Sequence, residues 1–435
     1  MIWNRDVETM ARARLEALQM DCLKRQVKRV YESVPFYRQA FRSRGVRPED
    51  VRSLNDLRLL PFTRKLDFRD NYPLGLLAVP RRNLARLHAS SGTTGKPIVV
   101  AYTSGDLATW QEVCARQLAA GGVTEEDTVQ VSMGYGLFTG AFGWHSGAER
   151  LGAAVIPVSS GNTRRQIMLI QDLETTVFCA TPSYAIYVAE QAEEMGVDVS
   201  AYSLRVGIHG AEPWSEAMRC EIRRRLGMDP IDTYGLSEIV GPGVSGECQE
   251  HCGLHVSEDH FLVEIVDPET NEPVPDGEAG EVVITTLTKE ALPVIRYRTG
   301  DISSLNVAPC RCGRTLARMA RVSGRTDDML IVRGVNVFPS QVEHVLLQLE
   351  GIQPHYLILV DRERGALDEL EVWVEVLPEV FSDEIGRLRS LQQRAEHEMR
   401  ETLGIEARVK LVEPGRIERS MGKAKRVIDR RDLGQ

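Results

Sequence analysis

Apolar runs and segments with helical periodicity alternate along the middle of the chain, from about residue 84 to 240. The strand-like runs are residues 154–160, 176–182 and 204–210. Apolar residues recur at helical spacing in the segments between and after these runs, at 164–173, 183–196 and 215–227. This alternation predicts a parallel sheet with crossover helices. Each strand-like run ends in small or turn-forming residues, and open α/β sheets bind their ligands just beyond such strand ends.

The segments before and after this middle region have different patterns. Residues 1–60 show helical spacing among many charged residues. Residues 260–306 predict antiparallel strands and turns. The region near the C-terminus has strand patterns at 355–361 and 370–376 and a helix pattern over about 382–403.

These patterns together predict an α/β fold with two domains. We expect a large N-terminal domain of parallel or mixed sheets with helices over residues 1–323, including a β-rich segment at about 245–320. A small α+β domain would follow over residues 324–435.

Residues 128–148 form an uncharged window that is long enough for a membrane helix. The window contains five glycines, Gly134, Gly136, Gly140, Gly143 and Gly147. Because a glycine costs a helix about 1 kcal/mol relative to alanine, we predict a strand followed by a glycine-rich turn instead.

Composition narrows the class of protein. The chain has 435 residues, 43% hydrophobic and 26% charged, as in a folded globular protein. Its 53 Lys and Arg against 62 Asp and Glu give a net charge of −9, which disfavours a nucleic-acid partner. Eight cysteines are too few for a disulfide scaffold, and the N-terminus lacks the apolar segment of a signal peptide. We therefore expect a cytoplasmic protein with no membrane partner.

A loop rich in Ser, Thr and Gly is a candidate phosphate site. It consists of Ser90, Ser91, Gly92, Thr93, Thr94, Gly95 and Lys96. Glycines allow backbone N–H groups to converge on an anion, and the hydroxyls and the ammonium add donors. The spacing is not that of the nucleotide-binding P-loop, which requires G-x-x-x-x-G-K-[ST]. A solvent-exposed turn remains the alternative for this loop taken alone.

The loop is similar to the signature of the AMP-forming acyl-adenylating superfamily, and further motifs of that superfamily follow in the same order. They are Gly210-Ala211-Glu212-Pro213, Tyr234-Gly235-Leu236-Ser237-Glu238, Tyr297-Arg298-Thr299-Gly300-Asp301, Gly324-Arg325-Thr326-Asp327-Asp328 and Ser420-Met421-Gly422-Lys423. Chance is an implausible source of so many ordered matches. The resemblance implies a large N-terminal α/β domain and a small mobile C-terminal domain.

Longer phrases resemble the phenylacetate–CoA ligase family in particular. They are YGLFTG at 135–140, GLHVSEDHF at 253–261, LTKEALPVIRYRTGD at 287–301 and GRTDDMLIVRGVNVFP at 324–339. The resemblance implies ATP-dependent, AMP-forming ligation of an arylacetate to coenzyme A, with Mg²⁺, by a homodimer. Two alternatives stay open: adenylation of another aromatic acid or a deazaflavin, and a non-catalytic scaffold on the same fold.

The resemblance also implies a role for each motif residue. Lys423 would bridge the carboxylate and the α-phosphate, although it lies in a basic tail of the kind that is often a solvated face. Glu238 would supply a carboxylate to Mg²⁺, Tyr234 an aromatic face to adenine, and Asp301 two acceptor oxygens to the ribose. The rest of the implied ATP site is Gly210, Ala211, Glu212, Pro213, Asp232, Gly235 and Arg325. A hinge within 319–323 would move Lys423, and Arg333 and Gly334 would line the thiol path.

Four aromatic residues in the uncharged window are candidates for binding a flat apolar acid. They are Tyr135, Phe138, Phe142 and Trp144. The alternative is an ordinary core segment. Relatives of the phenylacetate type tend to have smaller residues at positions 142 and 144, which leaves the exact acid open.

Cysteines and a histidine form two short clusters on either side of the β-rich segment. Cys310 and Cys312 can supply two thiolates, and Cys248 with His255 can complete a tetrahedral zinc site. Cys252 is a substitute for Cys248 or His255. In a reducing compartment this pattern favours structural Zn²⁺ over disulfides. Free buried thiols are the alternative.

Overall fold

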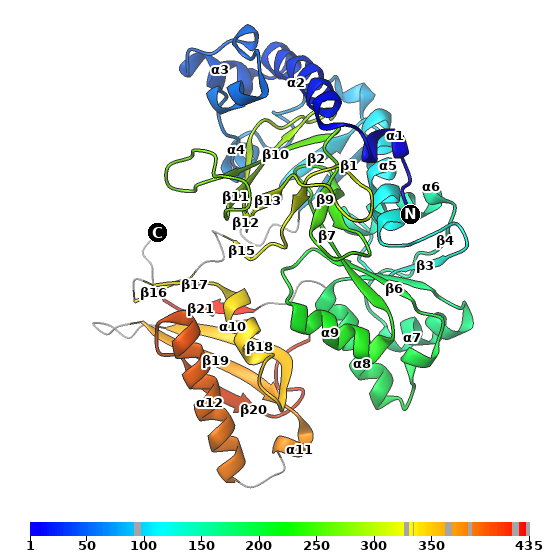
Figure 1. The fold of residues 1–435 in the computed structure, drawn as a ribbon, viewed down its shortest axis with the longest axis vertical. Coiled ribbons are helices and arrows are strands. Elements are labelled where there is room, and N and C mark those ends of the chain that lie inside the picture. The colour runs from blue at the N-terminus through cyan, green and yellow to red at the C-terminus, as the bar shows by residue number, and fades with distance from the viewer. Residues whose placement is uncertain are drawn as a thin grey trace. The chain divides into compact units, whose positions relative to one another are not determined.

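The computed structural model describes residues 1–90, 97–325, 330–333, 335–361, 368–381, 385–419 and 426–431 (Figure 1). Contacts divide the chain into two compact units. The first comprises Met1–Ala180, Asp198–Ala211 and Gly227–Val322, and the second comprises Thr181–Val197, Glu212–Leu226 and Ser323–Gln435. Two helices of the α/β region therefore group with the C-terminal part. The predicted domain boundary at about 323 stays a prediction.

A large mixed sheet organises the first unit. Among the described residues its strand order is β13-β14-β9-β8-β7-β6-β5-β3-β4. The run β4-β3-β5-β6-β7 is parallel, as the alternating pattern predicts, and the sheet turns antiparallel from β7 to β8. The strands are β3 Thr128–Val131, β4 Ala154–Ile156, β5 Val177–Ala180, β6 Val206–Gly210, β7 Asp229–Leu236, β8 Gly241–Glu247, β9 Leu254–Val256, β13 Leu305–Asn306 and β14 Arg318–Met319.

Two further sheets complete the first unit. Strands β10 (Phe261–Val266), β11 (Gly280–Thr286) and β12 (Tyr297–Ser303) pair antiparallel, which confirms the pattern predicted for 260–306. Strands β1 (Arg86–Ala89) and β2 (Val99–Tyr102) form an antiparallel pair.

The helices of the first unit include the N-terminal group expected from the pattern over 1–60. They are α1 Arg5–Glu8, α2 Arg12–Ser33, α3 Pro35–Ser43, α4 Lys65–Asp70, α5 Ser104–Ala120, α6 Gly140–Leu151 and α7 Thr163–Asp172, with 3₁₀ turns at Pro48–Asp50, Leu54–Leu59, Arg81–Asn83 and Val199–Ala201. Helix α2 is joined to the β-rich segment by side chains. Arg12 pairs with Glu258 at 2.7 Å, and the Gln26 amide donates to the Lys289 carbonyl at 2.6 Å.

The prediction of a glycine-rich turn is wrong from residue 140 onward, where helix α6 begins. The glycines are tolerated because they let α6 approach its neighbours closely. A Cβ on Gly147 would lie 2.5 Å from Cys114 Cβ on α5, and one on Gly143 would lie 2.8 Å from Trp110 Nε1. Close packing therefore outweighs the helix propensity of these residues. No helix in the described ranges has an apolar stretch long enough to cross a bilayer.

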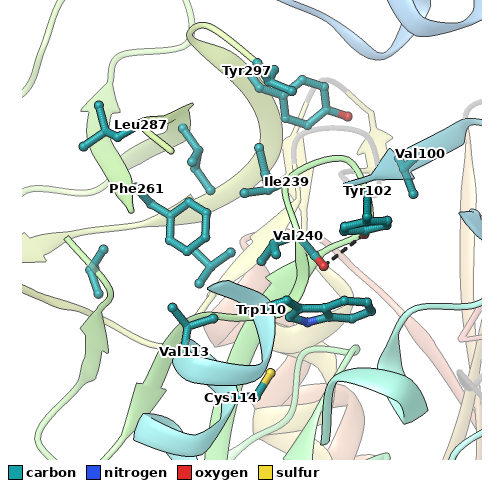
Figure 2. Packing of buried hydrophobic residues seen from close by; sticks show 14 of the residues in the cluster. Val100, Tyr102, Trp110, Val113, Cys114, Ile239, Val240, Phe261, Leu287 and Tyr297 are labelled. Atoms are coloured by element: carbon teal, nitrogen blue, oxygen red, sulfur yellow. Dashed lines mark hydrogen bonds between the residues drawn. The ribbon is translucent and has the colours of Figure 1, made fainter. Parts of the chain in front are cut away.

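The core of the first unit includes a cluster of buried residues between α5 and the neighbouring strands (Figure 2). The Tyr102 and Trp110 rings stack with their centroids 5.1 Å apart. The Tyr102 hydroxyl donates to the Val240 carbonyl at 3.0 Å, and Trp110 Nε1 donates to the Pro242 carbonyl at 2.9 Å. The aromatic core thus also holds the end of the segment between β7 and β8 and the start of β8.

The second unit contains a four-stranded sheet with the order β20-β19-β18-β21. The predicted strands 355–361 and 370–376 lie within β18 and β19, and helix α12 matches the pattern over 382–403. The elements of this unit are α8 Pro182–Glu194, α9 Glu216–Leu226, β15 Gly324–Arg325, β16 Leu330–Val332, β17 Val335–Val337, α10 Pro339–Leu346, β18 Ile352–Asp361, β19 Glu369–Val376, α11 Pro378–Phe381, α12 Ile385–Leu403, β20 Arg408–Val412 and β21 Val427–Asp429.

The close contact between α5 and α6 makes a prediction about stability. Gly147→Ala should lower the free energy of unfolding by about 1–3 kcal/mol, because the added methyl group overlaps Cys114. The matched control is Gly386→Ala on α12, where a Cβ meets nothing within 4 Å and where alanine should be neutral or stabilising. Thermal denaturation followed by circular dichroism measures both changes. Equal midpoints for Gly147→Ala and the unsubstituted protein would contradict the packing argument.

Candidate nucleotide and acid site

The ends of strands β6 and β7 bring two of the predicted motifs together. In this parallel pair, Gly210 lies opposite Thr233, the residue before Tyr234. The two strands approach so closely here that a Cβ on Gly210 would overlap the Thr233 carbonyl oxygen. Gly210 and Ala211 therefore lie beside Tyr234 and Gly235, at the edge where α/β sheets bind ligands.

Tyr234 and Asp301 come from different sheets and meet directly. The Tyr234 hydroxyl donates to Asp301 Oδ2 at 2.6 Å. The Asp301 backbone N–H donates to Thr299 Oγ1 at 3.0 Å, and only 5% of Asp301 is exposed. The carboxylate and the phenol ring are thus held in fixed positions relative to one another, as groups that bind one ligand must be.

Asp232 lies two residues before Tyr234 and interacts with Arg321. Its Oδ2 lies 3.3 Å from Arg321 Nε, and its backbone N–H donates to Glu247 Oε2 at 2.9 Å. Sequence reasoning missed Arg321, which falls within the predicted hinge 319–323. The pair ties that segment to strand β7. The predicted contact of Asp232 with the nucleotide stays a prediction.

Glu238 lies in the short loop between β7 and β8 and is only 8% exposed. Within the described part of the chain, its carboxylate accepts no hydrogen bond and pairs with no cation within 4.0 Å. Carboxylate oxygens are the ligands that Mg²⁺ prefers. A nearly buried carboxylate that has no partner among the described residues fits a role as a ligand of that cation.

Lys289 is a second buried group beside this loop, and sequence reasoning missed it because nothing in its motif marks the residue as buried. Its ammonium donates to the carbonyl of Ile239 and, at 3.4 Å, to that of Glu238. Burial lowers the pKa of Lys289 to about 8, although Asp106 and Glu238 act in the opposite direction. The ammonium is thus held in a core where charge is costly.

The two ends of the predicted phosphate loop are held together. The Ser90 backbone N–H donates to the Ile98 carbonyl at 2.9 Å, and the Ile98 N–H donates to Ser90 Oγ at 3.1 Å. Ser91, Gly92, Thr93, Thr94, Gly95 and Lys96 lie outside the described residues. Their contact with phosphate stays a prediction.

Several predicted site residues belong to the second unit. Glu212 accepts a hydrogen bond from the Ser183 backbone N–H at 2.8 Å, and Pro213 follows it. Arg325 lies on β15. The Arg333 side chain donates through Nε to the Asp368 carbonyl at 2.7 Å. Gly334 and Lys423 lie outside the described residues, so their predicted roles, and that of Arg333, stay predictions.

Two of the four candidate acid-binding aromatic residues pack against one another. The Tyr135 and Phe142 rings meet edge to face at 5.2 Å, and the Tyr135 hydroxyl lies 3.0 Å from His145 Nδ1. Phe138 is 48% exposed, whereas Trp144 is 1% exposed and belongs to the core cluster. The four residues therefore have unlike environments, and their role in acid binding stays a prediction.

Sequence reasoning missed one residue beside this aromatic group. His88 lies on β1, with its ring 5.3 Å from that of Phe142 and 5.8 Å from that of Trp110. Burial lowers the pKa of His88, although a hydrogen bond to the Leu137 carbonyl opposes the shift. No spacing pattern marks this histidine, because only the fold brings β1 next to α6.

Cys248, His255, Cys310 and Cys312 are brought together by the antiparallel part of the large sheet. Their ligand atoms all lie within 4.8 Å of one another. Strand β9 carries His255 and pairs with β8 on one side and β14 on the other, next to the loop with Cys310 and Cys312. The exposed Cys252 lies outside this group, with its sulfur 3.4 Å from Cys310 Sγ.

The chemistry of this cluster suits a thiolate-binding metal. Burial raises the pKa of Cys248. Burial would also raise the pKa of Cys312, but hydrogen bonds from His255 and Arg314 lower it overall. The Arg314 guanidinium donates to Cys312 Sγ at 3.6 Å and pairs with Glu8 at 2.5 Å. Three cysteines and one histidine fit tetrahedral Zn²⁺, with every position filled by protein.

Two family models match the chain. One described as AMP-binding enzyme matches residues 28–288, and one described as AMP-binding enzyme C-terminal domain matches residues 334–431. Together they cover both compact units in part.

Proteins of known name are similar to the chain over almost its whole length. It is 51% identical to a phenylacetate-coenzyme A ligase of Thermus thermophilus, covering 99% of this chain and all of that one. It is 50% identical to a phenylacetate-coenzyme A ligase of Escherichia coli, covering 98% and 97%. A crystal structure of 2-hydroxyisobutyryl-CoA ligase with 2-HIB-AMP matches with a TM-score of 0.94 and 29% identity, covering 99% of this chain and 93% of that one. The chain therefore belongs to the AMP-binding enzyme family and, within it, to the family of the phenylacetate-coenzyme A ligases.

Proposed function

We propose that this protein ligates phenylacetate or a close arylacetate to coenzyme A, with ATP as the energy source. The observation that carries the proposal is a sequence identity of 51% and 50% to two phenylacetate-coenzyme A ligases over nearly the whole chain. The reaction has two halves. A carboxylate oxygen attacks the α-phosphorus of ATP and pyrophosphate leaves. The sulfur of coenzyme A then attacks the acyl carbonyl carbon, and AMP leaves.

The pair Tyr234–Asp301 is the proposed anchor for the nucleotide. Two carboxylate oxygens of Asp301 can accept from the two hydroxyls of the ribose, a geometry that a neutral amide reproduces only in part. The Tyr234 hydroxyl already donates to one of these oxygens, which fixes the carboxylate before the nucleotide binds. Its ring would then offer a flat face to the adenine.

Glu238 is the proposed protein ligand of the Mg²⁺ that accompanies ATP. Bound Mg²⁺ neutralises phosphate charge, so that an anionic acid can approach the α-phosphorus. The role of the chain is to hold this carboxylate in place beside the ends of β7 and β8.

Lys423 is the proposed residue that stabilises charge in the first half-reaction, between carboxylate and α-phosphate. A lysine so close to the C-terminus, acting on a nucleotide held by residues 210–301, requires the part after about 323 to move as a domain. The first half-reaction requires a closed site, whereas the second requires access for a thiol. Enzymes with a hinge typically meet two such opposed requirements. Arg325, Arg333 and Gly334 are proposed contacts of nucleotide and thiol on that domain.

The acid would bind beside Tyr135 and Phe142, with Phe138 and Trp144 as further candidates. The edge-to-face pair supplies a flat apolar surface of the size of one aromatic ring. We also propose that the protein acts in the cytoplasm as a homodimer, the state that the family resemblance implies.

The first prediction concerns the reaction itself. With phenylacetate, ATP and coenzyme A, the protein should form AMP, pyrophosphate and phenylacetyl-CoA in equal amounts, measured by liquid chromatography. A panel of phenylacetate, benzoate, 2-hydroxyisobutyrate and a deazaflavin should rank phenylacetate first in kcat/KM. Formation of ADP and phosphate would contradict the proposal, and pyrophosphate release that depends on the acid but yields no coenzyme A thioester would favour a different acceptor.

A second prediction separates the two half-reactions. Lys423→Ala should slow acid-dependent pyrophosphate exchange by about 10²–10³-fold, the usual loss when one group that stabilises transition-state charge is removed. Thioester formation from supplied phenylacetyl-adenylate should change little. Lys425→Ala is the matched control, two residues away in the same basic tail. If Lys425→Ala gave the larger loss of exchange, the adenylating lysine would have to be reassigned.

A third prediction concerns the cluster of Cys248, His255, Cys310 and Cys312, for which we propose structural Zn²⁺. Protein purified without chelators should contain about one zinc per chain by mass spectrometry. Cys310→Ser should lose the metal and melt at a lower temperature, whereas Cys252→Ser should keep it. Zinc content unaffected by Cys310→Ser would contradict the assignment.

A further inference from the structure

The loop between β7 and β8 lies in the core, so its carbonyl groups need donors from the protein. Two buried side chains, Lys289 and Tyr102, supply them, and a third, Trp110, donates to the start of β8. Lys289 donates to the carbonyls of Glu238 and Ile239, Tyr102 to that of Val240, and Trp110 to that of Pro242. At the start of the loop, the Ser237 hydroxyl lies 3.0 Å from Thr139 Oγ1.

Lys289 is itself fixed on both sides. Its carbonyl accepts from the Gln26 amide at 2.6 Å. The backbone N–H groups of the next two residues, Glu290 and Ala291, donate to the Asp106 carboxylate at 2.6 and 3.0 Å. The ammonium lies 4.9 Å from the centre of the Tyr102 ring. The donor atom therefore has little freedom to follow the loop if the loop moves.

The contacts of the ammonium are made to the backbone and not to a carboxylate. Lys289 is only 6% exposed, and a charge so nearly buried is usually paired with an opposite one. Among the described residues, however, no carboxylate oxygen lies within 4.0 Å of Lys289 Nζ. Hydrogen bonds from a charged donor are about twice as strong as neutral ones. The charged donor acts at residues 238 and 239, whereas the neutral donors act further along, at 240 and 242. The strongest attachment of the loop is thus at Ile239, the residue directly after Glu238.

We propose that Lys289 is a positioning residue for adenylation, which holds the backbone of residues 238 and 239 so that the Glu238 carboxylate is presented to Mg²⁺. The inference rests on the proposed function, since it assigns Glu238 to the cation that accompanies ATP. Mutation of a group that orients a metal ligand typically weakens metal binding by about 10–100-fold. Lys289 acts on the metal through Glu238 and does not touch the reacting atoms.

The test measures cation binding without turnover. Mn²⁺ replaces Mg²⁺ as a paramagnetic probe, and its binding to the protein with α,β-methylene-ATP is followed by electron paramagnetic resonance. Lys289→Met, which keeps the length of the side chain and removes the donor, should weaken Mn²⁺ binding about tenfold. Lys289→Arg, which keeps the charge but shifts the donor atoms, should give an intermediate affinity. Lys28→Met, an exposed lysine on α2, is the matched control and should bind as the unsubstituted protein does.

A kinetic comparison separates positioning from a general structural role. In Lys289→Met, the Mg²⁺ concentration for half-maximal pyrophosphate exchange should rise by about the same factor as the Mn²⁺ dissociation constant. Thioester formation from supplied phenylacetyl-adenylate should be nearly unchanged, because pyrophosphate and its cation have left by then. Equal slowing of both half-reactions would overturn the proposal, and so would an unchanged Mn²⁺ affinity in folded Lys289→Met.

Lys289→Arg decides the question if Lys289→Met does not fold. Weaker Mn²⁺ binding in a folded Arg variant supports the proposal, and unchanged binding overturns it. Failure of the proposal for Lys289 can be distinguished from failure of the proposed function. If the unsubstituted protein activated no acid, the proposed function would fail, whereas the difference in Mn²⁺ affinity between the variants would still be measured with the ATP analogue.

Discussion

Backbone carbonyl groups buried between β7 and β8 are the constraint on which the candidate site depends. The sheet changes from parallel to antiparallel at this point, so the chain must reverse inside the core, where water cannot satisfy its polar groups. Tyr102 on β2 donates to the Val240 carbonyl (Figure 2), and Lys289, in the segment after β11, donates to the carbonyls of Glu238 and Ile239. The aromatic core and the buried lysine therefore do more than fill space. They fix the loop that carries Glu238, and the same strand β7 carries Tyr234 to its contact with Asp301.

The uncharged window illustrates how close packing can reverse a local preference. Glycine is a poor helix former, yet α6 contains Gly143 and Gly147 on the side that faces α5 and β8. Without side chains at these positions, the helix can lie against Trp110 and Cys114, whose polar atoms in turn reach Pro242. The side chains against which α6 packs are thus the same ones that hold the start of β8, directly after the Glu238 loop. Tyr135 and Phe142, the candidate acid-binding pair, lie before and within this helix.

Local patterns predicted the alternation of strands and helices, the antiparallel strands after residue 260 and the clustering of Cys248, His255, Cys310 and Cys312. Each of these depends on periodicity or on residue types that recur at short spacing, whereas the metal at the cluster stays a prediction. The turn predicted over the glycines of α6 was wrong because its reason lies in α5, some 30 residues earlier in the chain. Arg321, His88 and Lys289 were missed for a related reason. Each acquires its partners only through tertiary contacts, with Asp232, Phe142 and Ile239 respectively, and a single sequence carries no periodic signal for such pairs. The residues at 91–96 and 423 rest on motif resemblance alone.

Strand β8 connects the candidate metal site to the candidate nucleotide site. It begins at Gly241, directly after the Glu238 loop, and ends at Glu247, directly before Cys248. Seven residues of extended chain span roughly 20 Å, so a metal held by Cys248 is too far away to take part in a reaction at the proposed Mg²⁺ ligand Glu238. Its effect would be structural. His255, a member of the same cluster, lies on the neighbouring strand β9 and pairs there with Gly246 on β8. A zinc ion there would fix the register of β8 at one end, while Lys289, Tyr102 and Trp110 fix the loop at the other.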